Sequence, residues 1–299
     1  MTMDADWKLI QERTFLRWVN SHLKSVGTSV ENFEEDFSDG LKLIALVQVL
    51  SGKSLGRHNK KPNFRTQKLE NVSIVLTFLE GEGVTLVNID SSDIIDGKVK
   101  LLMSLVWTLI LHYCSGMEYD DEDQEDENSK EEEVKAEVKS PKQKLIGWFE
   151  RKLPQMSITN LTTDFQDGVK VGALVDSFAP GLCPDWEDWD TNEPVRNAKE
   201  AMDLAEDWLG VPKLLTPEEL TNKNVDEMSM MTYLSQFPKG KLKENAPLRV
   251  RPEVDKVEIK GITDEPSLAN AEAKFLVETK NAGDAELNLV VGIEPGERC

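Results

Sequence analysis

The sequence is poor in the residues on which catalysis and metal binding most often depend. Its 299 residues include only three Cys and three His. The Cys, at 114, 183 and 299, lack zinc-ligand spacing and offer no disulfide framework, which suits a reducing compartment. None of the His falls in a recognisable nucleophile motif, and there is no phosphate-binding loop or dinucleotide fingerprint. We therefore expect no cofactor, no metal and no enzymatic activity.

Positive charge is also scarce. The chain has 35 Lys and Arg against 55 Asp and Glu, a net charge of −20. Nucleic acid is a poor partner for such a chain, because affinity for it comes mainly from neutralising phosphates. The deficit is uneven: residues 1–113 hold 13 basic and 14 acidic side chains, whereas residues 114–139 hold 3 and 12. The N-terminal part is thus the least repelled by an acidic partner.

No apolar run is long enough to cross a membrane. The longest, residues 99–113, is shorter than the ~20 residues that a spanning helix needs. The N-terminus does not have the positive and then apolar layout of a signal peptide. We expect a soluble protein of the cytoplasm that does not insert into membranes.

The sequence does contain a long internal repeat. Residues 36–47 (DFSDGLKLIALV) recur without a gap as residues 164–175 (DFQDGVKVGALV), 128 positions downstream. Trp18 corresponds to Trp148, and Asn71 corresponds to Asn197. A unit of about 100 residues exceeds a solenoid repeat and has the size of a compact domain. The repeat predicts two copies of one domain, each with its own core.

Each copy has the pattern of a helical domain. Ile10, Leu16, Val19 and Leu23 approximate an apolar stripe at helical spacing. Residues 39–40 (Asp-Gly) predict the start of a buried helix that ends at Gly52. Further helices are expected from Val72 to Leu79 and over residues 99–113, the latter through the domain centre. The recurring pairs Asp36/Asp39 and Asp164/Asp167 are better explained by helix capping than by acid–base chemistry.

These motifs resemble a tandem pair of calponin-homology domains, the actin-binding head of the spectrin and filamin superfamily. The sequence is most similar to that of filamin in residues 107–113 (WTLILHY), 179–186 (APGLCPDW) and 231–238 (MTYLSQFP). The resemblance covers most of residues 5–247. It implies a mainly all-α protein of the actin cytoskeleton that binds the sides of F-actin. The first domain would make most of the contact, while the second would support and regulate it.

The expected domains are a first calponin-homology domain at 1–114, an acidic flexible linker at 115–140, a second calponin-homology domain at 141–247 and a partial repeat at 248–299. For the linker, three interpretations remain open. It is a solvated tether, an electrostatic lid over the basic loop 57–65, or a calcium site, although no Asp-x-Asp-x-Asp-Gly turn frames its carboxylates. Control by calmodulin or by phosphorylation at Ser129 or Ser140 also stays open.

The resemblance places actin contacts in three stretches of the first domain and at the edge of the second. In the opening helix they are Trp7, Lys8, Gln11, Phe15, Arg17 and Lys24. In the basic loop they are Arg57, His58, Lys60, Lys61, Phe64 and Arg65. At the start of the last helix they are Lys98 and Lys100, and in the second domain Lys142 and Lys144. Basic side chains would steer the encounter and a few apolar ones would supply affinity.

After residue 247 the pattern changes to strand-like alternation, at residues 254–260, 271–279 and 287–293. This resembles the opening part of an immunoglobulin-like filamin repeat. Such a sandwich needs about 100 residues, so it cannot close here. Truncation is favoured over pairing with another chain, and an oligomeric partner would act only through a missing C-terminal rod or such pairing.

Two alternatives to a filamin-type head remain. One is a head of the spectrin or alpha-actinin type, after which the chain would continue into helices. The other is a calponin-homology scaffold module with a partner other than actin.

Overall fold

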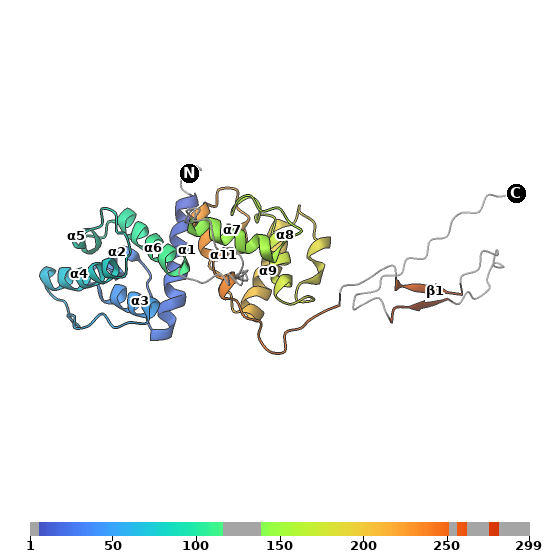
Figure 1. Cartoon of the computed structure of the whole chain (residues 1–299), viewed down its shortest axis with the longest axis horizontal. Coiled ribbons are helices and arrows are strands. Elements are labelled where there is room, and N and C mark those ends of the chain that lie inside the picture. The colour runs from blue at the N-terminus through green and yellow to red at the C-terminus, as the bar shows by residue number, and fades with distance from the viewer. Residues whose placement is uncertain (1–5, 116–138, 251–255, 262–274, 281–299) are drawn as a thin grey trace, which may run out of the picture.

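The computed structural model describes residues 6–115, 139–250, 256–261 and 275–280. The acidic segment 116–138 and the predicted strand at 287–293 lie outside these ranges. Within them the chain forms two helical halves and a small two-stranded sheet, which Figure 1 shows in sequence colours. The helices of the first half are α1 (Asp6–Leu23), η1 (Lys24–Val26), α2 (Phe33–Asp36), α3 (Leu41–Ser51), α4 (Arg65–Gly81), α5 (Ser91–Ile95) and α6 (Val99–Ser115).

The second half has a similar but not identical series of helices. Its helices are α7 (Pro141–Lys152), α8 (Val169–Phe178), η2 (Pro184–Asp188), α9 (Pro194–Leu204), the π-helix η3 (Ala205–Leu209), α10 (Pro217–Leu220), α11 (Glu227–Leu234) and η4 (Phe237–Lys239). Strands β1 (Glu258–Lys260) and β2 (Leu276–Glu278) pair antiparallel, with Ile259 opposite Val277. The sheet agrees with the strand-like pattern but is too small to define a sandwich.

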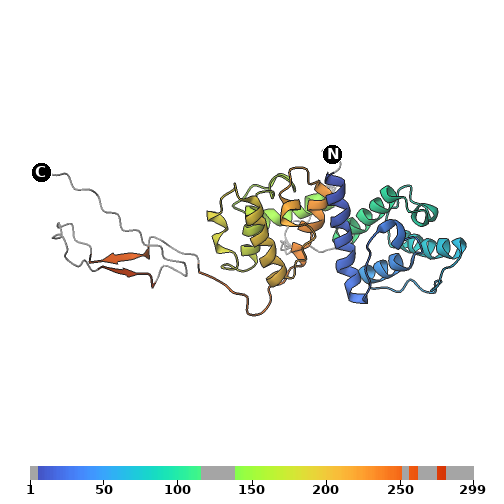
Figure 2. The same ribbon diagram turned by 180° about the vertical axis from the view of Figure 1, so that it is seen from behind.

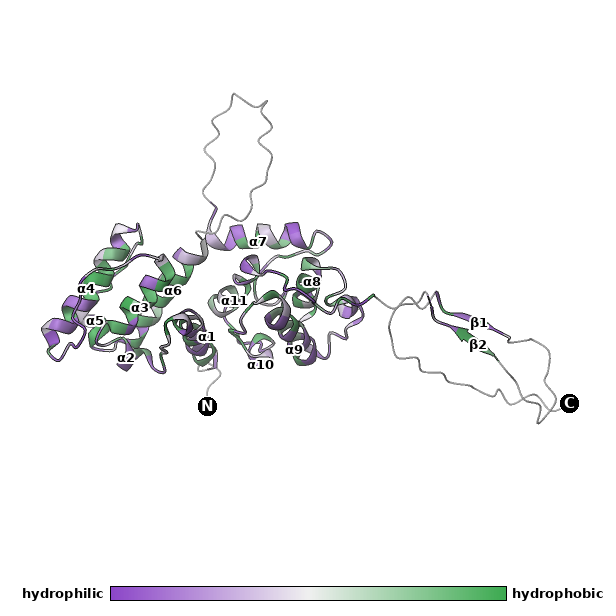
Figure 3. Ribbon diagram, turned by 90° about the horizontal axis from the view of Figure 1, so that it is seen from below, coloured by the Kyte–Doolittle hydropathy of each residue, from purple (hydrophilic) through white to green (hydrophobic). Residues whose placement is uncertain are grey.

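Helix α6 runs through the first core, as its composition predicts. Its buried side chains are Leu102, Leu105, Val106, Leu109 and Ile110, and much of the helix is green in the hydropathy colouring of Figure 3. Trp18 of α1 is fully buried. Trp148, its counterpart in the repeat, is 8% exposed in the second core. The core position of this Trp is thus common to both halves.

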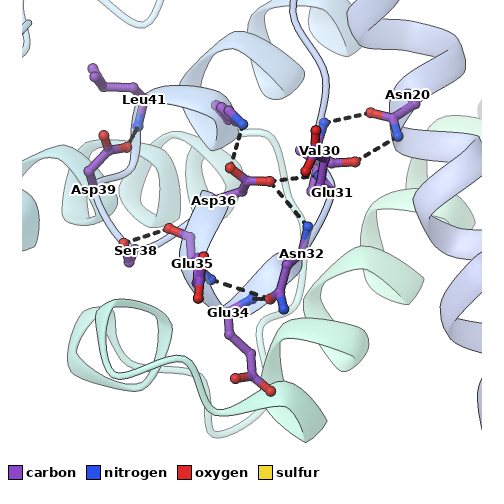
Figure 4. Close-up of polar contacts among 11 residues, drawn as sticks. Asn20, Val30, Glu31, Asn32, Glu34, Glu35, Asp36, Ser38, Asp39 and Leu41 are labelled. Carbon is purple, nitrogen blue, oxygen red and sulfur yellow. Dashed lines mark hydrogen bonds and ion pairs between the residues drawn. The ribbon is translucent and has the colours of Figure 1, made fainter.

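The acidic pair of the repeat forms hydrogen bonds in the first half, shown in Figure 4. The Asp36 carboxylate accepts backbone N–H groups of Glu31 at 2.6 Å and Asn32 at 3.1 Å, and it also binds Lys42. Asp39 accepts the N–H of Leu41 at 2.8 Å, at the first turn of α3. Asp39 therefore binds a backbone donor at the start of α3, as the capping interpretation predicts. Asp36 differs from that interpretation, because its backbone donors lie before α2 and not in the helix that follows.

The second half makes the same contacts. Asp164 accepts the N–H groups of Thr159 at 2.6 Å and Asn160 at 3.0 Å. Asp167 accepts the N–H of Val169 at 2.9 Å, where α8 begins. The two acidic pairs thus accept backbone N–H groups at corresponding positions in the two halves.

A glycine in each copy allows a close approach between helices. Gly40 has a φ of +78°, and a Cβ there would lie 2.8 Å from the Cβ of Asn71. Asn71 donates its amide N–H to the Asp39 carbonyl at 3.0 Å. Gly168 and Asn197 repeat this contact, with a φ of +77° and a virtual Cβ 2.4 Å from a backbone nitrogen of α9. Only glycine fits both the left-handed backbone and the lack of space.

Candidate functional site

Helix α1 lies at the boundary between the two halves, as both Figure 1 and Figure 2 show. One side of the helix buries Ile10, Phe15, Trp18, Val19 and Leu23 in the first core. Another side packs against α11 of the second half. An 18-residue helix with 3.6 residues per turn can present different side chains to each.

Gln11 forms the first polar contact across this boundary. Its side-chain amide donates to the Asp226 carboxylate at 2.8 Å and lies 3.4 Å from the sulfur of Met228. Asp226 also accepts the N–H of Met228 at 3.0 Å and so caps α11. The contact therefore joins α1 to the N-terminus of α11.

Arg17 forms the second contact. Its guanidinium donates to the Leu214 carbonyl at 3.1 Å and forms an ion pair with Glu219, whose side chain is only 10% exposed. Arg13 lies 3.6 Å from the same carboxylate. We call this set the interdomain latch: Gln11, Arg13 and Arg17 of α1 with Leu214, Glu219, Asp226 and Met228 of the second half.

A second group of polar residues lies on the opposite side of the first half. Figures 1 and 2 place α4 and α5 away from the second half. Arg65, at the start of α4, forms a bidentate pair with Asp96, with N–O distances of 2.5 and 3.1 Å. Lys98 binds Asp93 at 2.6 Å. The Arg65 pair ties the basic loop to the chain that enters α6.

We call this second group the basic rim: Arg57, Lys60, Lys61, Phe64, Arg65, Lys98 and Lys100. Phe64 is 69% exposed. Arg57, Lys60, Lys61 and Lys100 are exposed and form no ion pair within the described ranges. The hydrogen bond from Arg65 lowers the pKa of Asp96, and that from Lys98 lowers the pKa of Asp93. The rim therefore combines unpaired cations with one exposed aromatic ring.

A family model described as the calponin homology (CH) domain matches residues 9–115 and 139–241. The chain belongs to this family. We refer to the two matched halves as CH1 and CH2. The interdomain latch therefore joins CH1 to CH2, and the basic rim belongs to CH1 alone.

The curated relatives include filamins. The chain is 52% identical over 297 residues to Filamin-A of Drosophila melanogaster and 52% identical over 289 residues to Filamin-C of Rattus norvegicus. These matches cover 98% and 95% of the chain but only 13% and 10% of the relatives. Alpha-actinin-3 of Mus musculus is 34% identical over 79% of the chain, which is 25% of that protein. The similarity to filamin predicted from the motifs is confirmed.

Among solved structures, the actin-crosslinking core of Schizosaccharomyces pombe fimbrin has a TM-score of 0.59. It is 22% identical, and the match covers 79% of this chain and 51% of the fimbrin chain. At this identity the match supports the fold. It agrees with the mainly α-helical architecture predicted from the repeat.

The structure separates the residues expected in the opening helix. Phe15 is 1% exposed and stacks on Trp107 with ring centroids 6.0 Å apart, so it is a core residue with no surface for a partner. Gln11 and Arg17 are engaged in the latch. Lys8 is exposed with its Nζ 5.5 Å from the Trp7 ring, and Lys24 is exposed in η1, directly after α1.

The remaining expected residues divide between the two domains. The basic loop and the start of α6 come together in the basic rim, although His58 is half-buried with its Nδ1 3.2 Å from the Gly56 carbonyl. Lys142 pairs with Glu227 at 2.7 Å, within CH2, and Lys144 is exposed. Their role in binding stays a prediction.

Sequence reasoning did not identify the CH2 side of the latch. Thr216 and Glu219 have capping-box spacing, and they do form that box, with the Thr216 N–H donating to Glu219 at 2.9 Å. The second role of this carboxylate has no local signal, because its partner lies 202 residues away.

The described ranges contain no cluster of His, Cys, Asp and Glu that could hold a metal ion. None of the helices in those ranges is long and apolar enough to span a membrane. Cys183 is fully buried, and burial raises the pKa of its thiol far above the ordinary value. It is therefore an inert core side chain.

Proposed function

We propose that this chain is an F-actin-binding head that works by binding rather than catalysis, in the cytoplasm as part of the actin cytoskeleton. The basic rim of CH1 carries the proposal. In a chain with a net charge of −20, the loop before α4 and the start of α6 supply four exposed cations that form no ion pair within the described residues, together with the exposed Phe64. Such a surface suits an acidic polymer, because cations speed the encounter and a buried aromatic anchor adds affinity.

We further propose that CH2 regulates this head through the interdomain latch. Gln11 and Arg17, which the family resemblance assigns to actin, are held by CH2. A filament that used this face of α1 would have to displace α11. Binding by the basic rim alone would not. The docked arrangement thus favours a partial contact, and release of CH2 would extend it.

The domain bounds expected from the sequence, CH1 at 1–114 and CH2 at 141–247, form part of this proposal. Crosslinking of filaments would belong to a longer protein, since the chain spans about a tenth of the filamins it matches. The continuation into β1 and β2 favours a filamin-type head over a spectrin-type head, which would continue into helices.

The test is co-sedimentation with F-actin over a range of salt concentrations. Lys60→Glu with Lys61→Glu should lower the affinity about tenfold and flatten its salt dependence, with an unchanged melting temperature. Lys223→Glu with Lys241→Glu is the matched control. Both lysines are exposed and lie in or directly after CH2, and the two substitutions change the net charge by the same amount. Equal binding by the two double variants would rule out the basic rim as the contact.

A further inference from the structure

The segment that leaves CH2 folds back along that domain instead of departing directly. We call residues 240–249 the exit strap. After η4, the N–H of Lys241 donates to the Leu209 carbonyl at 3.0 Å, and the N–H of Lys243 donates to the Trp208 carbonyl at 2.8 Å. These carbonyls end the π-helix η3 and have no partner within it. The strap therefore completes the C-terminus of that helix.

The Lys243 side chain strengthens this attachment. Its Nζ donates to the Asp207 carbonyl at 2.6 Å and to the Glu206 carbonyl at 3.2 Å. A cation at the C-terminus of a helix also interacts favourably with the helix dipole. By contrast, the Lys241 side chain is exposed and forms no hydrogen bond or ion pair within the described part of the chain.

The other end of the strap is held by the loop that follows α8. The N–H of Arg249 donates to the Gly181 carbonyl at 2.7 Å, and its guanidinium pairs with Asp185 at 2.7 Å. Gly181 has a φ of +98°, and a Cβ there would lie 2.4 Å from the Arg249 carbonyl oxygen. The loop thus has the backbone geometry and the free space that a docked strap requires.

The strap and the interdomain latch hold neighbouring parts of one segment of CH2. The strap binds residues 206–209, and five residues beyond Leu209 the Leu214 carbonyl accepts Arg17 from CH1. Leu209, Val211 and Leu214 are all buried, so this segment is packed against the core along its length. It ends at Glu219, the main acidic partner in the latch.

We propose that the exit strap is a further component of the interdomain latch. When docked, it braces residues 206–209 and so holds Leu214 and Glu219 in place for Arg17. A pull on the chain beyond residue 250 would first peel the strap and then weaken the hold of CH2 on α1. The strap suits release, because most of its side chains, including Leu242 and Leu248, are exposed and few apolar contacts retain it.

Only the effect of the strap on actin binding rests on the proposed function. The coupling between the exit strap and the interdomain latch can be measured without actin. Lys243→Met in the 299-residue chain removes the two side-chain hydrogen bonds and keeps the apolar stem. We expect hydrogen exchange to rise about three- to tenfold in residues 241–249 and, through the coupling, in residues 205–219. Lys241→Met, with the same change in charge on the same strap, should leave both segments unchanged.

A double-mutant comparison with Arg17→Ala distinguishes coupling from coincidence. If the strap supports the latch, the effects of Lys243→Met and Arg17→Ala on exchange in residues 210–219 will be less than multiplicative. Independent sites would give multiplicative effects. Multiplicative effects would overturn the proposal. So would faster exchange confined to residues 241–249 in Lys243→Met, or equal effects of Lys241→Met and Lys243→Met. Loss of actin binding in rim variants would leave this outcome untouched.

Discussion

Arg17 of CH1 and Glu219 of CH2 form an ion pair across the domain boundary, in which the carboxylate is 10% exposed and the guanidinium 33% exposed. Glu219 has a second cation nearby in Arg13 and also caps α10. A carboxylate so placed is stabilised by both domains at once. The pair therefore links the stability of CH2 to its contact with α1.

Glu219→Gln should weaken the interdomain contact by about 1–3 kcal/mol, because it leaves Arg17 half-buried without its charged partner. Differential scanning calorimetry should show a lower or a divided transition. If CH2 masks part of the actin surface, F-actin affinity should rise. Glu218→Gln is the matched control, since Glu218 is the neighbour of Glu219 in the sequence and its side chain is exposed. Equal effects of the two changes would mean that the latch does not hold the domains together.

Phe64→Ala should lower F-actin affinity by more than about 1 kcal/mol without changing stability, because the ring is 69% exposed and contributes little to the core. Val87→Ala is the control and should leave F-actin affinity unchanged, because Val87 is also in CH1 and 64% exposed but lies outside the basic rim. Co-sedimentation and thermal unfolding measure the two quantities. Wild-type affinity in Phe64→Ala would remove the ring from the proposed contact.

Gly40→Ala should destabilise CH1 by more than about 2 kcal/mol, because a positive φ and a Cβ 2.8 Å from Asn71 both oppose the side chain. Gly168→Ala should do the same to CH2. The control is Gly147→Ala, in the middle of α7 with no atom within 4 Å of the added Cβ, which should be neutral or stabilise by up to about 1 kcal/mol. Chemical denaturation measures the free energy of unfolding of each variant and so ranks their stabilities.

Asp36 should make stability depend on acidic pH. Burial alone would raise the pKa of this carboxyl, but hydrogen bonds from Lys42 and from the N–H groups of Glu31 and Asn32 leave it below the ordinary value. The stabilisation is therefore complete above the unfolded-state pKa of about 4 and is lost as pH falls through the lower folded-state pKa.

Asp36→Asn should consequently lower the melting temperature at pH 7, and the difference from wild type should shrink toward pH 3. The Asp164 pKa is lowered as well, by the N–H groups of Asn160 and Thr159 after the opposing effect of burial. Asp164→Asn should thus show the same trend for CH2. A difference from wild type that stays constant with pH would contradict this account.

Much of the architecture follows from local signals. The Asp-Gly start at 39–40 and Gly52 predict α3, and the structure has that helix at Leu41–Ser51 with Gly52 as its C-cap. The repeat also indicates that Asn197 takes the place of Asn71, which the hydrogen bonds to Asp39 and Asp167 confirm. These features could be predicted because each depends on residues that lie close together or recur in register.

The candidate site was less predictable. The basic loop can be recognised from its composition, but its attachment to the chain entering α6 depends on the Arg65–Asp96 pair, 31 residues apart. The resemblance alone did not separate Phe15 in the core from Lys8 on the surface. The two residues share one helix, and only the packing of its sides distinguishes them.

By itself the sequence determined that two copies of a helical domain follow one another and where several helices of the first copy lie, because capping groups, glycines and apolar periodicity act over a few residues. Only the tertiary structure decided that α1 serves both domains and that the exit strap returns to CH2. Those contacts join groups up to 217 residues apart. They depend on how the surfaces of already folded helices pack against one another, which no single segment of the sequence determines.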